Sequence, residues 1–160
     1  MRVPSVLWSG LPVAVLLAGV LPAQADSVRS AEFNIYLQDG RGNVQTVQST
    51  VVPLVPKFAC YGWRIRLDGK DRLVQATEVF TLPAAPKTWG NEGDQFSATD
   101  VAKDRLTSTT TLFYPLKNGW FGHQWCVAAG DPTGPYTIKV YLAAHLLKQF
   151  DFVVQRVSTH

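Results

Sequence analysis

The sequence predicts an all-β fold: a single antiparallel β-sandwich of immunoglobulin-like or fibronectin-like architecture, with seven or eight strands and one disulfide. Three observations lead to this prediction. Apolar and polar residues alternate with a period of two along most of the chain, and helical periodicity is hard to find. Turn signals at residues 68–71 and 130–135 separate the alternating runs. The two cysteines form an even pair, which suits one disulfide.

The first 25 residues are predicted to be a cleaved signal peptide, which leaves residues 26–160 as the β-sandwich domain. Arg2 is the only charge in this segment, residues 11–21 form a short apolar core, and residues 23–25 form an A-x-A cleavage signal. The alternative is a retained membrane anchor, but an apolar core of roughly ten residues is short for a bilayer, which needs about 20. We therefore expect a periplasmic or secreted chain with no membrane span after cleavage.

The charge balance argues against nucleic acid as a partner. The chain has 15 basic and 12 acidic residues, and loss of Arg2 with the signal peptide leaves a net charge of about +2. The basic residues are spread along the sequence, whereas nucleic-acid-binding surfaces gather them in a patch or stripe. An exported location argues against this partner as well.

Cys60 and Cys126 are predicted to form a structural disulfide. An even pair in an oxidising compartment favours a bridge, and closing a loop of this length destabilises the unfolded chain by about 4 kcal/mol in the chain-entropy treatment. The alternative is a redox or metal-binding pair. The sequence has no C-x-x-C motif and the two cysteines lie far apart, so we favour the structural bridge.

Runs that alternate or are rich in β-branched residues mark the expected strands. These runs are residues 32–38, 46–55, 58–67, 73–82, 106–114, 120–128, 136–142 and 146–154. The tight turn at 68–71 joins two of them into a hairpin, and the last two runs form another. Tyr136 directly follows the Gly- and Pro-rich turn, so we expect its ring to close one end of the core.

Residues 83–103 interrupt the alternation and are expected to form a long polar loop. The segment carries Pro83, Pro86 and an isolated Trp89. Long loops in compact domains are uncommon and often functional. The alternative is a plain strand connection, with a short edge strand or helical turn near residues 98–103.

The sequence contains no convincing catalytic or metal-binding constellation, and we expect no cofactor. A zinc or copper site needs three or four ligands, and the chain has three histidines. His123 and Cys126 have ligand-like spacing, but Cys126 is expected to be oxidised, and residues three apart in a strand point to opposite faces. A serine hydrolase would need a G-x-S-x-G motif, which is missing from the sequence.

The carboxylates suggest two further kinds of site, and neither is supported. Glu78, Glu92 and Asp94 give no sign of two carboxylates on opposed walls, which a glycosidase requires. Calcium prefers oxygen ligands, and the loop supplies some, but their spacing fits no recognisable calcium loop. Those oxygen-bearing residues are Asn91, Glu92, Asp94 and Asp100.

Aromatic and basic side chains supply the candidate binding residues, which are Trp89, Trp120, Trp125, Arg64 and Arg66. Trp120 shares one strand face with Cys126, whereas Trp125 shares the other with Phe121. An exposed Trp could stack on a sugar or anchor a protein, and two arginines on one face could pair with an acidic partner. Alternatively, the aromatic residues of this strand fill the core and cover the disulfide, and the arginines form a solvated face.

Two stretches carry a resemblance to a known family. They read FACYGWRIRLDGKDRLVQATEVFTLP at residues 58–83 and GDPTGPYTIKVYLAAHLLKQFDFVV at residues 130–154, with a loop and an aromatic-rich strand between them. In this order of features the chain resembles a family of small exported bacterial β-sandwich domains catalogued as a domain of unknown function. The resemblance spans most of residues 26–160. It implies a β-sandwich and transfers no catalytic residue.

These observations favour a non-catalytic binding or assembly module of the bacterial cell envelope. It would recognise a protein partner through a sheet edge, an aromatic patch or the long loop. The first alternative is a carbohydrate- or small-ligand-binding domain, which an exposed, coplanar Trp pair in a groove would favour. The second is a hydrolase, which would require polar residues that converge in a pocket. Fold alone does not decide among these functions.

Overall fold

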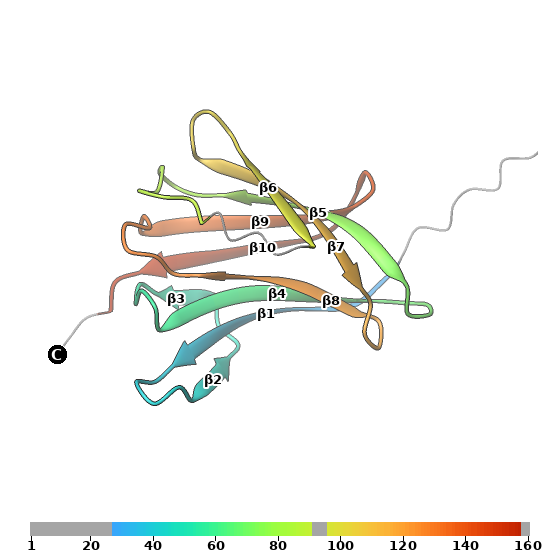
Figure 1. Cartoon of the computed structure of the whole chain (residues 1–160), viewed down its shortest axis with the longest axis horizontal. Coiled ribbons are helices and arrows are strands. Elements are labelled where there is room, and N and C mark those ends of the chain that lie inside the picture. The colour runs from blue at the N-terminus through green and yellow to red at the C-terminus, as the bar shows by residue number, and fades with distance from the viewer. Residues whose placement is uncertain (1–26, 91–95, 158–160) are drawn as a thin grey trace, which may run out of the picture.

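Two β-sheets face each other in the computed structural model, which describes residues 27–90 and 96–157. A four-stranded sheet has the order β2-β1-β4-β8, and a six-stranded sheet has the order β3-β10-β9-β5-β7-β6 (Figure 1). The strands are β1 Val28–Gln38, β2 Val44–Val47, β3 Val51–Pro53, β4 Ala59–Leu67, β5 Leu73–Thr81, β6 Ser97–Val101, β7 Thr107–Pro115, β8 Trp120–Cys126, β9 Gly134–Leu142 and β10 His145–Gln155. The predicted all-β sandwich is confirmed, and so is the terminal hairpin, β9 with β10. The predicted hairpin of residues 58–67 with 73–82 is wrong, because β4 and β5 lie in different sheets.

The predicted signal peptide lies outside the described residues, so its cleavage and the domain boundary at residue 26 stay predictions. The same holds for Asn91, Glu92 and Asp94 of the calcium alternative. Within the part of the chain that the structure describes, no helix is long and apolar enough to cross a bilayer.

The structure has ten strands where the sequence predicts seven or eight. The run predicted at residues 46–55 is divided between β2, which pairs with β1, and β3, which runs parallel to β10 in the other sheet. Pro53 ends β3 at a sheet edge, where a missing N–H is tolerated. The remaining extra strand is β6, an edge strand, which agrees with the alternative of a short edge strand near residues 98–103.

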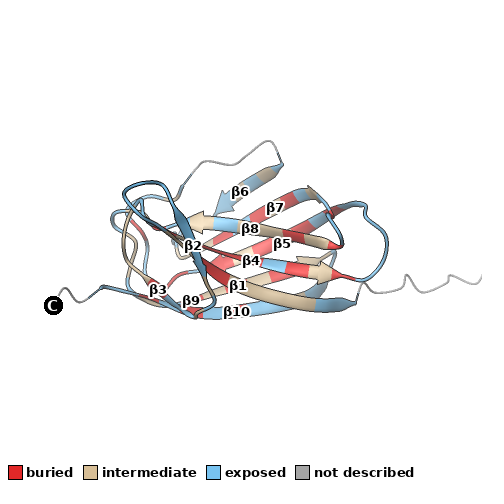
Figure 2. Ribbon diagram, turned by 90° about the horizontal axis from the view of Figure 1, so that it is seen from below, coloured by how far each residue is buried: buried red, intermediate tan, exposed pale blue. Residues whose placement is uncertain are grey.

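Strict alternation along the strands fills the space between the sheets. In β4, Tyr61, Trp63 and Ile65 are buried, whereas Arg64 between them is exposed. Figure 2 looks onto the four-stranded sheet and shows buried and exposed segments following one another along β4. Removing these large apolar side chains from water is the main force that holds the two sheets together.

Tyr136 closes one end of this core, as predicted. Its side chain is buried, and its ring packs against Phe80 and Phe152 at centroid distances of 5.7 and 5.4 Å. Its hydroxyl donates a hydrogen bond of 2.7 Å to the carbonyl of Pro132, four residues earlier. This contact ties the turn to the start of β9, as the tyrosine corner does in immunoglobulin-type sandwiches.

The predicted disulfide joins Cys60 of β4 to Cys126 of β8, which are direct register partners with Cα atoms 3.9 Å apart. Phe121 and Trp125 point into the core from the opposite face of β8. The alternative in which the aromatic residues of this strand cover the disulfide is therefore wrong. Side chains alternate between the two faces of a strand, so Cys126, which follows the inward-pointing Trp125, points to the outer face, and the bridge lies there.

Candidate functional site

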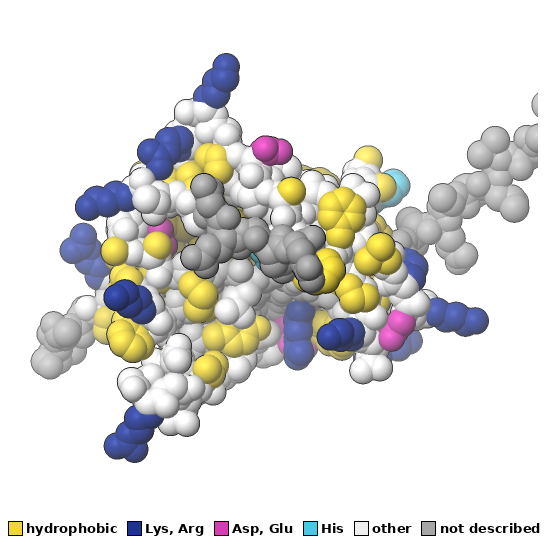
Figure 3. Space-filling model, viewed as in Figure 1, with side chains coloured by type: hydrophobic (Ala, Val, Ile, Leu, Met, Phe, Trp, Pro, Cys, Tyr) yellow, Lys and Arg dark blue, Asp and Glu magenta, His cyan; other side chains and the backbone are white. Residues whose placement is uncertain are grey.

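The outer face of the four-stranded sheet brings three of the five candidate binding residues together. Arg66 is the register partner of Trp120, and Arg64 is the partner of Gly122. Alternation turns all of these positions away from the core. Figure 3 shows the Lys and Arg side chains of one face of the molecule scattered over it rather than gathered in one continuous patch.

The best-defined contact on this outer face is a stack of Arg64 on Trp120. The guanidinium carbon of Arg64 lies 4.6 Å from the indole centroid, and its Nε lies 2.6 Å from a carboxylate oxygen of Glu32. Glu32 thereby holds the guanidinium in place, and the hydrogen bond from Arg64 lowers the pKa of that carboxyl. Arg66 has no ion-pair partner among residues 27–90 and 96–157.

Two adjoining hollows form what we call the outer-face groove. Tyr36 and Gln124 line both hollows, which have volumes of about 400 and 240 Å³. The larger hollow is lined by Arg64, and also by Trp63, His123 and two residues of the other sheet, Ser97 and Tyr114. The smaller one reaches Val44 and Phe58, which are 61% and 46% exposed, and Lys57. The groove therefore runs from an end with an arginine and aromatic residues to a mainly apolar end that Lys57 also borders.

Two glycines allow β4 and β8 to approach closely along this groove. A Cβ atom on Gly122 would lie 2.4 Å from the carbonyl oxygen of Trp63, and one on Gly62 would lie 2.5 Å from that of His123. Both clashes are with backbone atoms, which cannot rotate away. Glycine inside a strand often marks such an approach, and this signal was available in the sequence.

Trp89 and Trp125 lie apart from the outer-face groove, between the two sheets. Their rings are 6.3 Å apart at an interplanar angle of 74°. The indole N–H of Trp89 donates to the carbonyl of Arg105 at 3.0 Å, which fixes this loop residue against the next segment of the chain. The pair is not coplanar, which removes the feature that would favour carbohydrate stacking.

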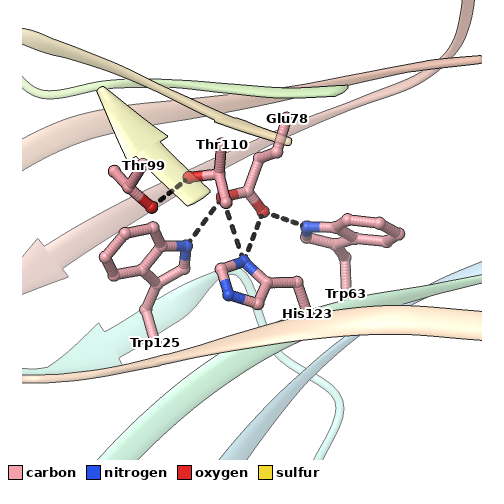
Figure 4. A network of polar contacts seen from close by, with 6 residues as sticks. All are labelled: Trp63, Glu78, Thr99, Thr110, His123 and Trp125. Atoms are coloured by element: carbon pink, nitrogen blue, oxygen red, sulfur yellow. Dashed lines mark hydrogen bonds and ion pairs between the residues drawn. The ribbon is translucent and has the colours of Figure 1, made fainter. Parts of the chain in front are cut away.

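A buried carboxylate at the centre of the sandwich is the feature that the sequence analysis missed. Glu78 of β5 is 0% exposed and accepts hydrogen bonds from the indole N–H groups of Trp63 and Trp125, the second at 2.8 Å (Figure 4). The Nδ1 atom of His123 lies 3.2 Å from both carboxylate oxygens. We call these four side chains the Glu78 network.

The Glu78 network joins the two sheets through polar contacts, since Glu78 belongs to one sheet and its three partners to the other. A histidine held by a carboxylate is a common part of acid–base sites. Here, however, the neighbouring hydroxyls of Thr99 and Thr110 hydrogen-bond each other at 2.9 Å rather than the imidazole. Among the described residues, no three His, Cys, Asp or Glu side chains are grouped as metal ligands.

The sequence did contain a signal for the buried carboxylate. Val74, Ala76 and Phe80 of β5 all point inward, and Glu78 occupies the same phase of the alternation. A charged residue at a core position is rare unless it is paired. The donors could not be identified from the sequence, because they come from strands that are distant along the chain.

These features define the class of protein: a single immunoglobulin-like β-sandwich domain with one cross-strand disulfide. Comparison with family models matches residues 31–155 to the PM0630 beta sandwich domain, and the chain belongs to that family. The resemblance to a family of small β-sandwich domains, which was stated from the sequence, is confirmed. A search of curated proteins finds no match.

Comparison with solved structures supports the same architecture. The crystal structure of an immunoglobulin-like protein from Pseudomonas aeruginosa is similar, with a TM-score of 0.52 and 16% sequence identity. The alignment covers 82% of this chain and 98% of that chain. At this identity the likeness concerns the fold alone, and the function has to be argued from the residues of this chain.

Proposed function

We propose that this domain is a non-catalytic, exported binding module of the bacterial cell envelope, which recognises a protein partner through the outer-face groove. The observation that carries the proposal is the stack of Arg64 on Trp120 at one end of a groove whose other end is apolar. Trp, Tyr and Arg are enriched among the residues that dominate protein–protein binding energy. Tyr36 and Arg64 line the groove, and Trp120 lies beside it, stacked on Arg64.

The charges on the groove indicate the chemistry of the partner. Arg66 lacks a carboxylate partner within the described chain, and Arg64 is half exposed although it is paired with Glu32. An acidic side chain of a partner would therefore find an arginine donor at this end. An apolar side chain would cover Val44 and Phe58 at the other end. We infer an extended protein segment that carries both kinds of side chain.

Two observations support an exported location for this module. The Cys60–Cys126 bridge requires an oxidising compartment to form and persist. The predicted signal peptide gives a route to such a compartment. The proposal gives the Glu78 network a structural role, because the two indole N–H groups and His123 already contact its carboxylate oxygens.

The proposal is tested by crosslinking the native exported protein in cells and quantifying the captured envelope protein. Trp120→Ala and Arg66→Ala remove outer-face side chains beside the arginine end of the groove, and Lys139→Ala on β9 of the other sheet is the matched control. We expect capture of one partner to fall at least about tenfold in the groove variants, as loss of a hot-spot side chain implies. Equal capture by all variants, each folded and oxidised, would contradict the proposal.

A further inference from the structure

A second hollow lies between the sheets, at the end of the core that Tyr136 closes. It has a volume of about 250 Å³, and we call it the aromatic pocket. Its wall includes five aromatic rings and one carboxylate; they are Tyr61, Phe80, Trp89, Trp125, Tyr136 and Asp131. None of these six residues lines the outer-face groove.

The ring pairs that are in contact in the aromatic pocket are not parallel, since their interplanar angles run from 42° to 87°. Trp89 meets Phe80 at 87° and Trp125 at 74°, with centroid distances of 5.9 and 6.3 Å. Tyr61 meets Phe80 at 70°. Such walls cannot clamp a flat molecule between parallel faces, as sugar or base stacking requires, but they can surround a rounded group.

The electrostatics of the pocket favour a positive charge. Asp131 lies in the wall, and burial raises the pKa of its carboxyl. Burial also raises the pKa of Tyr61 well above its ordinary value, with smaller contributions from Tyr136, Asp131 and Glu78. A cation in the pocket would offset the cost of the buried negative charge, whereas an anion would increase that cost.

The basic side chains of the neighbouring loop do not neutralise this pocket. Arg105 donates to the carbonyls of Pro86 and Lys87, both at 3.0 Å, and the stem of Lys87 lies against Gly130. Neither Arg105 nor Lys87 is part of the pocket wall. Tyr61 is part of the wall, and its hydroxyl offers a ligand one polar contact.

We propose that the aromatic pocket binds a small organic cation, a quaternary or tertiary ammonium compound that carries one hydroxyl or carbonyl group. The ammonium group would lie among the ring faces, where cation–π attraction is strongest for Trp and increases with desolvation. Asp131 would supply the counter-charge, and Tyr61 would hydrogen-bond the polar group. This inference goes beyond the proposed protein-binding function and uses a different pocket, which shares Gln124 with the outer-face groove.

Choline chloride is the probe for this proposal, because it combines a quaternary ammonium group with a hydroxyl. The matched control ligand is its neutral carbon analogue, in which a quaternary carbon replaces the nitrogen. In titrations of the oxidised protein followed by NMR, we expect choline to shift the indole N–H resonances of Trp89 and Trp125 saturably. The neutral analogue should bind at least about tenfold more weakly, as desolvated cation–π attraction implies.

Two variants separate this pocket from general effects on the fold. Asp131→Asn keeps an oxygen that can accept the N–H of Ala128, a bond of 2.8 Å in this structure, and should weaken choline binding about tenfold. Trp120→Phe alters only the outer face and should leave choline binding unchanged. Absence of a saturable shift in the folded protein, or equal affinity for choline and its neutral analogue, would overturn the proposal.

Discussion

Replacing Glu78 with Gln is predicted to destabilise the domain by about 1–3 kcal/mol, although the two side chains have nearly the same shape. The carboxylate accepts hydrogen bonds from Trp63, Trp125 and His123. A carboxamide has one oxygen and one NH₂ group. On one side its NH₂ group therefore faces an indole N–H, so that two donors meet without an acceptor. At least one indole N–H then lacks an acceptor, which costs about 1–3 kcal/mol for a buried group.

The substitution also has a stabilising effect, because it removes a buried charge. A buried carboxylate pays a desolvation penalty of several kcal/mol, and Gln removes that penalty. Each hydrogen bond to a charged group, however, contributes about 1.5–3 kcal/mol, and Glu78 accepts from three partners. We therefore expect the lost hydrogen bonds to exceed the relieved penalty, leaving a net destabilisation.

Urea unfolding of the oxidised protein, followed by far-ultraviolet circular dichroism, measures this difference. Glu32→Gln is the matched control, because it removes a carboxylate from a partly exposed ion pair, worth about 0–1 kcal/mol. A Glu78→Gln variant as stable as the wild type, or more stable, would refute the claim that the Glu78 network holds the two sheets together.

Three further predictions concern the strands and the pocket. Gly122→Ala should cost about 1–3 kcal/mol in thermal melts, because its Cβ meets backbone, whereas Gly40→Ala, with no atom within 4 Å of its Cβ, should change little. Replacing Cys60 and Cys126 together with Ser should lower the free energy of unfolding by about 4 kcal/mol in urea. Asp131→Asn should raise stability at neutral pH, because burial raises the folded-state pKa of Asp131 and the ionised carboxylate is costly. That gain should vanish as the pH falls below 3.8, the ordinary Asp pKa, where the acid is protonated in both states.

Specific results would contradict these three predictions. Equal melting temperatures for the two glycine variants would show that β4 and β8 do not need the close approach. A double Ser variant as stable as the oxidised protein would assign the disulfide no stabilising role. A stability difference for Asp131→Asn that stays constant from neutral pH to below 3.8 would contradict desolvation as the cause of the raised pKa.

The sequence predicted the parts of the fold that depend on local pattern. Alternation correctly placed Trp120 and Cys126 on one face of β8 and Trp125 on the other. It could not show that residues 46–55 contribute to both sheets, because the partner of β3 is β10, near the other end of the chain. Sheet membership is decided by such long-range pairings, and local propensity carries little information about them.

In the candidate site, too, the local pattern predicts which face a residue occupies, whereas its contacts depend on long-range pairing. Arg64 and Arg66 were placed on one face by their spacing, but the ion pair with Glu32 depends on the pairing of β1 with β4. The contact of Trp89 with Trp125 likewise joins a loop to a strand distant in sequence. Glu78 was visible as a charge at an inward position, and only the folded structure supplies the donors that make its burial tolerable.

Site-specific photocrosslinking in living cells tests the central claim, that the outer-face groove binds a protein partner, most directly. A photoreactive side chain is placed at Gln124 inside the groove, and in a second variant at Leu73, which is 69% exposed and does not line the groove. We predict one adduct of defined mass from position 124, lost when Arg66→Ala is added, and no such adduct from position 73. The same adduct from both positions, or an adduct from position 73 alone, would contradict the account.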